Sequence, residues 1–169
     1  ASVLAQSAVN VTIYISIDPS DDGTEVWCQA YAAEHANVVL LPSVGPFGGA
    51  SRNFFRLIRD VDFDGYDFVA FADQDDIWHL DKLQCATDSI RTFNVDAYSS
   101  NVTAFWPNGK THLLNKALCN GFINSNHIFF FMRITGAQNF VDDIAVIGQK
   151  NKPFRRFIQP AYRKYALRV

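Results

Sequence analysis

The sequence contains no long hydrophobic run. No stretch of about 18 consecutive apolar residues occurs in the 169 residues, so we expect no membrane-spanning helix. The chain also lacks a basic segment followed by an apolar one at its start, and we expect no signal peptide. Internal repeats and low-complexity tracts are absent as well. These absences favour a globular domain over a membrane protein or an extended array.

An excess of positive charge is also missing. Fifteen Lys and Arg residues face 17 Asp and Glu residues, which gives a net charge of −2. A nucleic-acid-binding domain normally carries a strongly basic face, so we expect no nucleic-acid partner. Cysteine is scarce, and Cys28, Cys85 and Cys119 are far apart in the sequence. This odd, dispersed set fits buried thiols in a reducing compartment better than a disulfide framework or a zinc site.

Apolar residues are abundant, at 49% of the chain, and 15 of them are Phe. A composition of this kind supports one well-packed domain. Apolar, β-branched runs alternate with helical patterns of 10 to 15 residues, which is typical of an α/β fold with a mostly parallel sheet. The predicted strands are 11–16, 38–41, 68–72, 98–106 and 127–134, with a hairpin turn at 107–110. The predicted helices are 24–35, with Thr24 as its N-cap, 50–61 and 77–93, and residues 141–169 carry mixed helical signals.

Three carboxylates follow the apolar strand Phe68 to Ala72: Asp73, Asp75 and Asp76. In open α/β sheets, ligands bind outside the carboxyl ends of the strands. Clustered carboxylates repel one another unless a cation or hydrogen-bond donors neutralise them, and hard oxygen ligands suit Mg²⁺ or Mn²⁺. The pattern therefore favours a metal site, although an acidic first turn of a helix would have the same composition.

Two further segments follow predicted strands. Asp18, Asp21 and Asp22 form a second acidic cluster, which fits either the same cleft or a solvated turn. The stretch from Gly48 to Phe54 combines two glycines, which allow a close approach of the backbone to a ligand, with Arg52 and Asn53. Those two side chains are suited to contact a phosphate or a base, although paired glycines also mark ordinary turns.

Together these segments resemble glycosyltransferase family 2, and within it the rhamnosyltransferase-like members. The resemblance extends over residues 1–116, and its most specific part is the string from Asp73 to Trp78 at a strand end. The other segments that carry it are Ile15-Ser16-Ile17-Asp18-Pro19-Ser20, Gly23-Thr24, Asn53-Phe54, Lys82-Leu83 and the stretch from Tyr98 to Phe105.

The resemblance implies a GT-A fold, a Rossmann-like mostly parallel sheet flanked by helices, that binds a nucleotide-sugar through Mg²⁺ or Mn²⁺. It implies that Asp75 and Asp73 bind the metal, with Asp73 also near the ribose, and that Asp18 recognises the pyrimidine base. Residues 1–116 then form the nucleotide-sugar-binding core. Residues 117–169 form an acceptor-side segment of the same single domain.

The implied reaction is an inverting transfer, in which a carboxylate base deprotonates the acceptor hydroxyl. Asp142 and Asp143 are the candidates for that base, although the pair also fits the N-cap of a late helix. The implied donor is a dTDP- or UDP-sugar, and the implied transferred group is a deoxysugar such as rhamnose. The implied acceptor is a saccharide or a lipid-linked saccharide of cell-surface polysaccharide synthesis. We expect a cytoplasmic protein at the inner face of the bacterial plasma membrane, where the basic residues of 155–164 form either a membrane-facing or a solvated surface.

The chain departs from the family pattern at three places. It shows no counterpart of the family's opening strand with its Thr-Tyr-Asn motif, and residues 1–6 resemble the end of the helix that follows that strand. Ile17 stands where the family has Asp, and Pro19 stands where it has Gly. These departures leave open a catalytically inactive or truncated fragment that binds nucleotide weakly or not at all.

A haloacid-dehalogenase-type phosphohydrolase is a more remote alternative. Such enzymes also carry an Asp-x-Asp motif after a strand, with the first Asp as nucleophile. They usually place Thr or Val two residues after the second Asp, where this chain has Ile77. The motif also lies in the middle of this chain rather than after its first strand.

Overall fold

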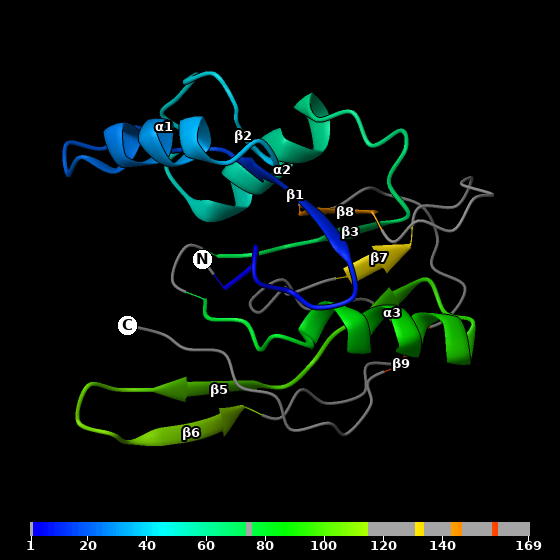
Figure 1. Cartoon of the computed structure of the whole chain (residues 1–169). Helices are drawn as coiled ribbons and strands as arrows, with labels where there is room; N and C mark the ends of the chain where they lie inside the picture. The colour runs from blue at the N-terminus through cyan, green and yellow to red at the C-terminus, as the bar shows by residue number, and fades with distance from the viewer. Residues whose placement is uncertain (1, 74–75, 115–130, 134–142, 147–156, 159–169) are drawn as a thin grey trace.

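The structure is a computed structural model, and it describes residues 2–73, 76–114, 131–133, 143–146 and 157–158 (Figure 1). Three helices and nine strands lie within these ranges. In chain order they are β1 (Asn10–Ile15), α1 (Thr24–Glu34), β2 (Val38–Leu40), α2 (Ala50–Asp60), β3 (Phe68–Ala70), α3 (Lys82–Phe93), β4 (Ala97–Tyr98), β5 (Val102–Phe105), β6 (Thr111–Leu114), β7 (Phe131–Arg133), β8 (Asp143–Val146) and β9 (Phe157–Ile158).

Seven of these strands form one sheet in the order β2-β1-β8-β3-β7-β4-β9. β2, β1, β8 and β3 run parallel to one another, while β7 is antiparallel to both of its neighbours. β1 and β3 are therefore not paired with each other, because β8 lies between them. The predicted α/β fold with a mostly parallel sheet is confirmed.

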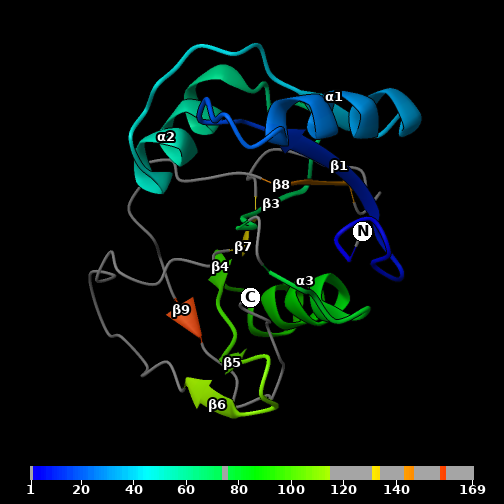
Figure 2. The same cartoon turned by 90° about the vertical axis from the view of Figure 1, so that its left-hand side faces the viewer.

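Helices cover both faces of the sheet. α1 and α2 lie on one face and α3 lies on the other (Figure 2). The alternation of side chains along β3 explains this arrangement, since successive residues of a strand point to opposite faces. Phe68 and Ala70 pack into the cluster that contains Leu83 and Ile90 of α3. Val69 and Phe71 pack instead with Leu57 of α2. A strand buried on both faces reads as a continuous apolar run, as this one does.

The hairpin expected near residue 107 is present as a separate two-stranded sheet. β5 and β6 pair in antiparallel fashion, with Phe105 opposite Thr111. The turn is closed by a hydrogen bond from the Trp106 N–H to the Lys110 carbonyl, 2.9 Å long. Gly109 has a φ of 79°, a left-handed conformation that favours glycine at this position of the turn.

The helix expected over 77–93 begins only at Lys82, and residues 76–79 form no regular structure. Residues 2–5 form turns rather than the end of a helix. The residue before the first turn of α1 is Gly23, with a φ of 85°, so the prediction that Thr24 is the N-cap is wrong. In the late region with mixed helical signals, the described residues 143–146 and 157–158 are strands.

Two further expectations concern single properties of the chain. No helix in the described ranges has both the length and the hydrophobicity needed to cross a bilayer. Cys28 is a free, buried thiol, and desolvation raises its pKa. The Cys85 thiol donates a hydrogen bond to the Asp81 carboxylate at 3.6 Å. The third cysteine, Cys119, lies outside the described residues.

Candidate functional site

The loops that carry the predicted site residues leave the sheet at one edge. β1, β2 and β3 share one direction in the sheet, so their carboxyl ends point the same way (Figure 1). Asp18 follows β1, the glycine-rich stretch follows β2, and Asp73 follows β3. This is the edge at which open parallel sheets place their ligands.

Asp18 is bonded to the glycine-rich loop. Its carboxylate accepts hydrogen bonds from the Phe47 N–H at 2.7 Å and the Gly48 N–H at 2.9 Å. Beside this contact, a Cβ atom placed on Gly45 would lie 2.4 Å from Cδ of Pro19. Only glycine allows the two loops to approach so closely. The loop after β1 and the loop after β2 are therefore joined by two hydrogen bonds to Asp18 and pack closely beside them, at Gly45 and Pro19.

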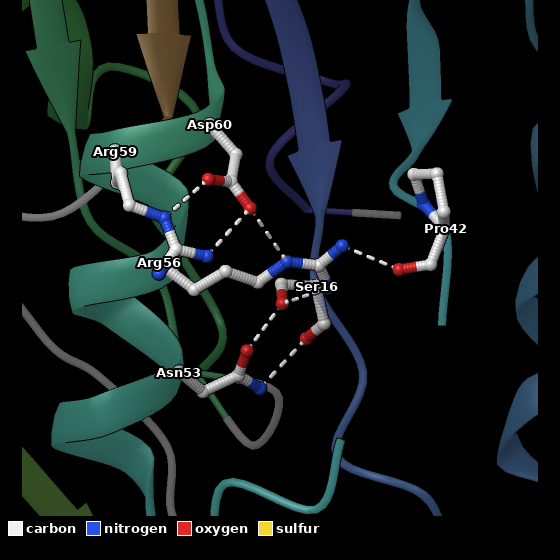
Figure 3. Close-up of polar contacts among 6 residues, drawn as sticks. All are labelled: Ser16, Pro42, Asn53, Arg56, Arg59 and Asp60. Carbon is white, nitrogen blue, oxygen red and sulfur yellow. Dashed lines mark hydrogen bonds and ion pairs between the residues drawn. The ribbon is translucent and has the colours of Figure 1, made fainter. Parts of the chain in front are cut away.

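Asn53 connects α2 to the end of β1. Its amide nitrogen donates to the Ser16 carbonyl at 2.9 Å, and its amide oxygen accepts from the Ser16 hydroxyl (Figure 3). Sequence reasoning assigned Asn53 to the nucleotide. In the structure both ends of its amide contact the chain itself, which gives Asn53 a bracing role at the edge of the site.

Arg56 completes this network and is not among the site residues predicted from the sequence. Its guanidinium donates to the Ser16 hydroxyl at 2.9 Å, to the Pro42 carbonyl and to the Asp60 carboxylate at 3.2 Å (Figure 3). It also lies over the Phe47 ring, 5.6 Å from the centroid. Arg56 is 4% exposed, and a buried charge needs such partners. An arginine next to the apolar face of a predicted helix was the available signal.

Arg52 lies on the same helix, one turn earlier, and its side chain is exposed. One of its guanidinium nitrogens lies 3.4 Å from the Phe47 carbonyl oxygen. Arg52 is therefore next to the loop that Asp18 holds. A guanidinium at this position is chemically suited to a phosphate group, which it binds through paired N–H donors.

Asp73 is half-buried and lies three residues after the end of β3, and the Asp76 N–H donates to its backbone carbonyl at 3.3 Å. Asp75, the other predicted metal ligand, lies outside the described residues. Within the described ranges, no three His, Cys, Asp or Glu side chains are grouped so that they could hold a metal ion. The proposal that this edge binds Mg²⁺ or Mn²⁺ therefore rests on the residue types of Asp73 and Asp75, because carboxylate oxygens are hard ligands that suit these ions.

Asp22 belongs to the turn before α1. Its carboxylate accepts hydrogen bonds from the Ser20 hydroxyl at 2.6 Å and the Thr24 N–H at 2.9 Å. These bonds, the one from Ser20 first, lower its pKa to about 2. These contacts match the solvated-turn interpretation of the second acidic cluster, because Asp22 accepts from the N–H of Thr24, the first residue of α1.

Of the two candidates for the catalytic base, only Asp143 lies within the described residues, and it lies at the opposite end of the parallel strands from Asp18 and Asp73. Asp142 is outside the described residues, and Asp143 is the first residue of β8, opposite Asn10 in the parallel pairing with β1. It therefore stands at the amino end of the sheet, whereas Asp18 and Asp73 follow carboxyl ends. A strand, and not the helix expected from sequence, begins at Asp143. The structure does not bring Asp143 together with the other candidates.

Comparison with known proteins gives three matches. A family profile described as "Glycosyltransferase like family 2" matches residues 1–140. The dTDP-rhamnosyl transferase RfbG of Shigella flexneri is 44% identical over 117 residues, which cover 69% of this chain and 40% of that protein. The succinoglycan biosynthesis protein ExoW of Rhizobium meliloti (strain 1021) is 34% identical over 70 residues, 41% of this chain and 20% of that protein. The chain thus spans less than half the length of either relative.

Proposed function

Because this chain belongs to the glycosyltransferase-like family 2, we propose that it forms the donor-binding part of a metal-dependent, inverting glycosyltransferase. The donor we propose is a nucleoside diphosphate sugar, with a dTDP-deoxysugar such as dTDP-rhamnose first, since one relative is a dTDP-rhamnosyl transferase. The acceptor is a saccharide or a lipid-linked saccharide of a surface polysaccharide, and one relative is a succinoglycan biosynthesis protein. The expected place of this reaction, the inner face of the bacterial plasma membrane, stays a prediction.

The observation that supports this proposal most is the placement of three loops at one sheet edge. Asp18 and Asp73 follow parallel strands, and Arg52 lies in the first turn of the helix that follows the loop bonded to Asp18. In this arrangement the loop after β1 is the base-binding side. The first turn of α2 is the phosphate side, and the residues after β3 are the metal side.

Each side chain has a proposed role. Asp73 and Asp75 hold the cation, which when bound neutralises the charge of the diphosphate leaving group. Arg52 contacts a phosphate oxygen, and Asn53 braces the helix that carries Arg52. Asp18 holds the glycine-rich loop against the base. The acceptor-activating base, for which Asp142 and Asp143 are the candidates from sequence, stays a prediction.

Isothermal titration with dTDP and with UDP, each with and without Mn²⁺, tests the proposal. We expect Mn²⁺ to tighten binding, and Asp73→Asn or Asp75→Asn to weaken Mn²⁺-dependent binding by about tenfold or more, because each removes a charged ligand. Asp88→Asn is the matched control, since Asp88 is an exposed carboxylate on α3. It should bind like the wild type.

Two outcomes would contradict the proposed function. No nucleotide binding with or without Mn²⁺ would contradict the proposal and favour a non-binding fragment, an alternative that fits the 40% coverage of the Shigella relative. Hydrolysis of a generic aryl phosphate that Asp73→Asn abolishes would instead indicate a phosphohydrolase with Asp73 as nucleophile.

A further inference from the structure

A buried glutamine near the start of the chain is bonded to the segment that follows the predicted metal ligands. Gln6 is 8% exposed. Its amide nitrogen donates to the His79 carbonyl at 2.7 Å and to the Ser2 carbonyl at 3.1 Å. Its amide oxygen accepts from the Leu83 N–H at 2.9 Å. One side chain therefore joins a turn at the start of the chain to a segment more than 70 residues later.

Gln6 acts as the missing cap of α3. The first four N–H groups of a helix have no partner within it, and an N-cap side chain usually accepts from the second or third of them. α3 begins at Lys82, and Asp81, the residue in the N-cap position, makes no capping hydrogen bond with its side chain. Leu83 is the second residue of the helix, so Gln6 provides the acceptor that a local cap would have supplied.

Neighbours of Gln6 hold the preceding residues in the same way. The N–H and the hydroxyl of Ser7 both donate to the Leu80 carbonyl, at 2.8 and 3.0 Å. The Trp78 N–H donates to the Ser2 hydroxyl at 3.1 Å. The Trp78 side chain is itself buried in the cluster under α3. Residues 78–83 are thus bonded along their backbone to residues 2–7 and cannot shift without breaking several hydrogen bonds.

The segment whose sequence contains the predicted metal ligands connects two parts of the chain that are held in place. On one side β3 ends at Ala70, in the centre of the sheet. On the other side begins the segment 78–83, fixed by the contacts with residues 2–7. Only residues 71–77 connect these points, and they include Asp73 and Asp75. A site whose flanks are held in place loses less conformational entropy when it orders around a ligand.

We propose that Gln6 is a positioning residue for the metal-binding segment: it caps α3, fixes residues 79–83 and thereby holds the C-terminal end of the segment 71–77, whose sequence contains the proposed metal ligands Asp73 and Asp75. The inference rests on the proposed function, since it concerns the same carboxylates. Gln6 touches neither ligand nor reacting atoms in this role. Its effect is on the geometry of the segment that does.

Two substitutions of Gln6 test the role. Gln6→Met keeps the length of the side chain and removes both hydrogen-bonding ends. Gln6→Glu keeps an acceptor for the Leu83 N–H and loses the donor to the His79 and Ser2 carbonyls. Asn37→Ala is the matched control. The Asn37 side-chain amide also donates to a backbone carbonyl, that of Val11, at 3.0 Å, but this contact lies at the amino end of the sheet.

The measurement is the affinity for dTDP with and without Mn²⁺, well below each variant's melting temperature. We expect Gln6→Met to weaken the Mn²⁺-dependent binding by about tenfold, the size typical of lost support behind a metal ligand, and to leave metal-free binding nearly unchanged. Gln6→Glu should also weaken the Mn²⁺-dependent binding, because an ionised carboxylate cannot donate to the His79 and Ser2 carbonyls. Asn37→Ala should lower the melting temperature without changing the effect of Mn²⁺. If Gln6→Met does not fold, Gln6→Glu carries the comparison.

Equal Mn²⁺ dependence in Gln6→Met and the wild type would overturn the inference, and so would an equal loss in Asn37→Ala. If the wild type shows no Mn²⁺-dependent binding, the proposed function fails, and hydrogen exchange then decides on Gln6 separately. Gln6→Met should speed amide exchange at Leu83, whose N–H loses its acceptor, while amides of α1 keep their protection. Unchanged exchange at Leu83 would show that Gln6 does not hold this segment.

Discussion

Arg56 is the most heavily bonded side chain at the edge of the candidate site. It is buried and donates to Ser16, Pro42 and Asp60, so its removal deletes a hydrogen bond to each of these three acceptors. We expect Arg56→Met to lower the free energy of unfolding by about 2–4 kcal/mol, measured by urea denaturation.

Arg59 provides the control for that measurement. It contacts the same Asp60 carboxylate at 2.6 Å, but its side chain is 71% exposed. Exposed ion pairs contribute little, so Arg59→Met should change the free energy of unfolding by less than about 1 kcal/mol. Equal losses in the two variants would contradict the view that burial of Arg56 makes its contacts important.

Gly45 allows a second prediction for a single residue. A methyl group at this position would collide with the Pro19 ring, which cannot rotate away. We expect Gly45→Ala to destabilise the protein by about 1–3 kcal/mol, the usual cost of overpacking, measured by thermal or urea unfolding. The double variant Pro19→Gly with Gly45→Ala should recover most of the loss. If the double variant is no more stable than Gly45→Ala, the clash is not the cause.

Asn53 and Arg56 show why single residues of the site were only partly predictable. The residue type of Asn53 and its glycine-rich neighbourhood predict a contact with the nucleotide. Its partner in the structure, Ser16, lies 37 positions earlier in the chain. Local sequence indicates that an amide or guanidinium will bind something polar, but only the packing of α2 on β1 determines that the partner is the protein itself.

At the scale of an element, β1 is coupled to the loop before β3 through two tyrosines. The hydroxyls of Tyr14 and Tyr66 are 3.0 Å apart, and their rings pack edge to face with centroids 6.2 Å apart. Burial, and then the hydrogen bond with Tyr66, raises the pKa of Tyr14 from 10.0 to about 12. The folded state therefore holds the Tyr14 proton more tightly than the unfolded state does.

This pKa gives stability a dependence on alkaline pH. Below pH 10 both states are protonated and the contribution of Tyr14 is complete; between pH 10 and 12 only the unfolded state releases the proton, so stability falls. We expect the urea midpoint of the wild type to decline more steeply over this interval than that of Tyr14→Phe. Tyr66→Phe should lie between them, because burial of Tyr14 remains. Parallel curves for all three would contradict the assignment.

Most elements were predictable from periodicity, and their boundaries were less so. The helices 24–34 and 50–60 and the strands β1, β2 and β3 lie within a few residues of the predicted ranges. α3 begins five residues later than expected, at Lys82. The reason is non-local, since backbone groups of residues 78–80 are bonded to residues 2–7. A local pattern contains no information about such a partner.

At the scale of the whole molecule, the two apolar clusters share β3 as their common wall. Leu83 is 1% exposed in the cluster under α3, and Leu57 is 7% exposed in the cluster under α2. We expect Leu83→Ala and Leu57→Ala each to lower the free energy of unfolding by about 2–5 kcal/mol. If the domain is one cooperative unit, tryptophan fluorescence and circular dichroism will report the same transition in both variants. Separate transitions would divide the domain at β3.

The strand order of the sheet was not predictable from the sequence. The fold class follows from alternation of strands and helices, but which strand separates β1 from β3 depends on hydrogen bonds between residues more than 70 positions apart. The same limit applies to the acidic pair at 142–143. A carboxylate before an apolar run fits the start of a helix or of a strand, and its distance from Asp18 depends on the sheet as a whole.

The position of β8 has a consequence for the order in which the protein is assembled during translation. A ribosome completes β1, β2 and β3 long before it reaches Asp143–Val146, the strand that lies between β1 and β3. Until then the pair β2-β1 and the strand β3 with α3 are two pieces with no shared backbone ladder. The sheet becomes continuous only when β8 joins its two parts, after every described strand except β9 has been synthesised. The loops that carry Asp18 and Asp73 gain a common edge only at that late stage of synthesis.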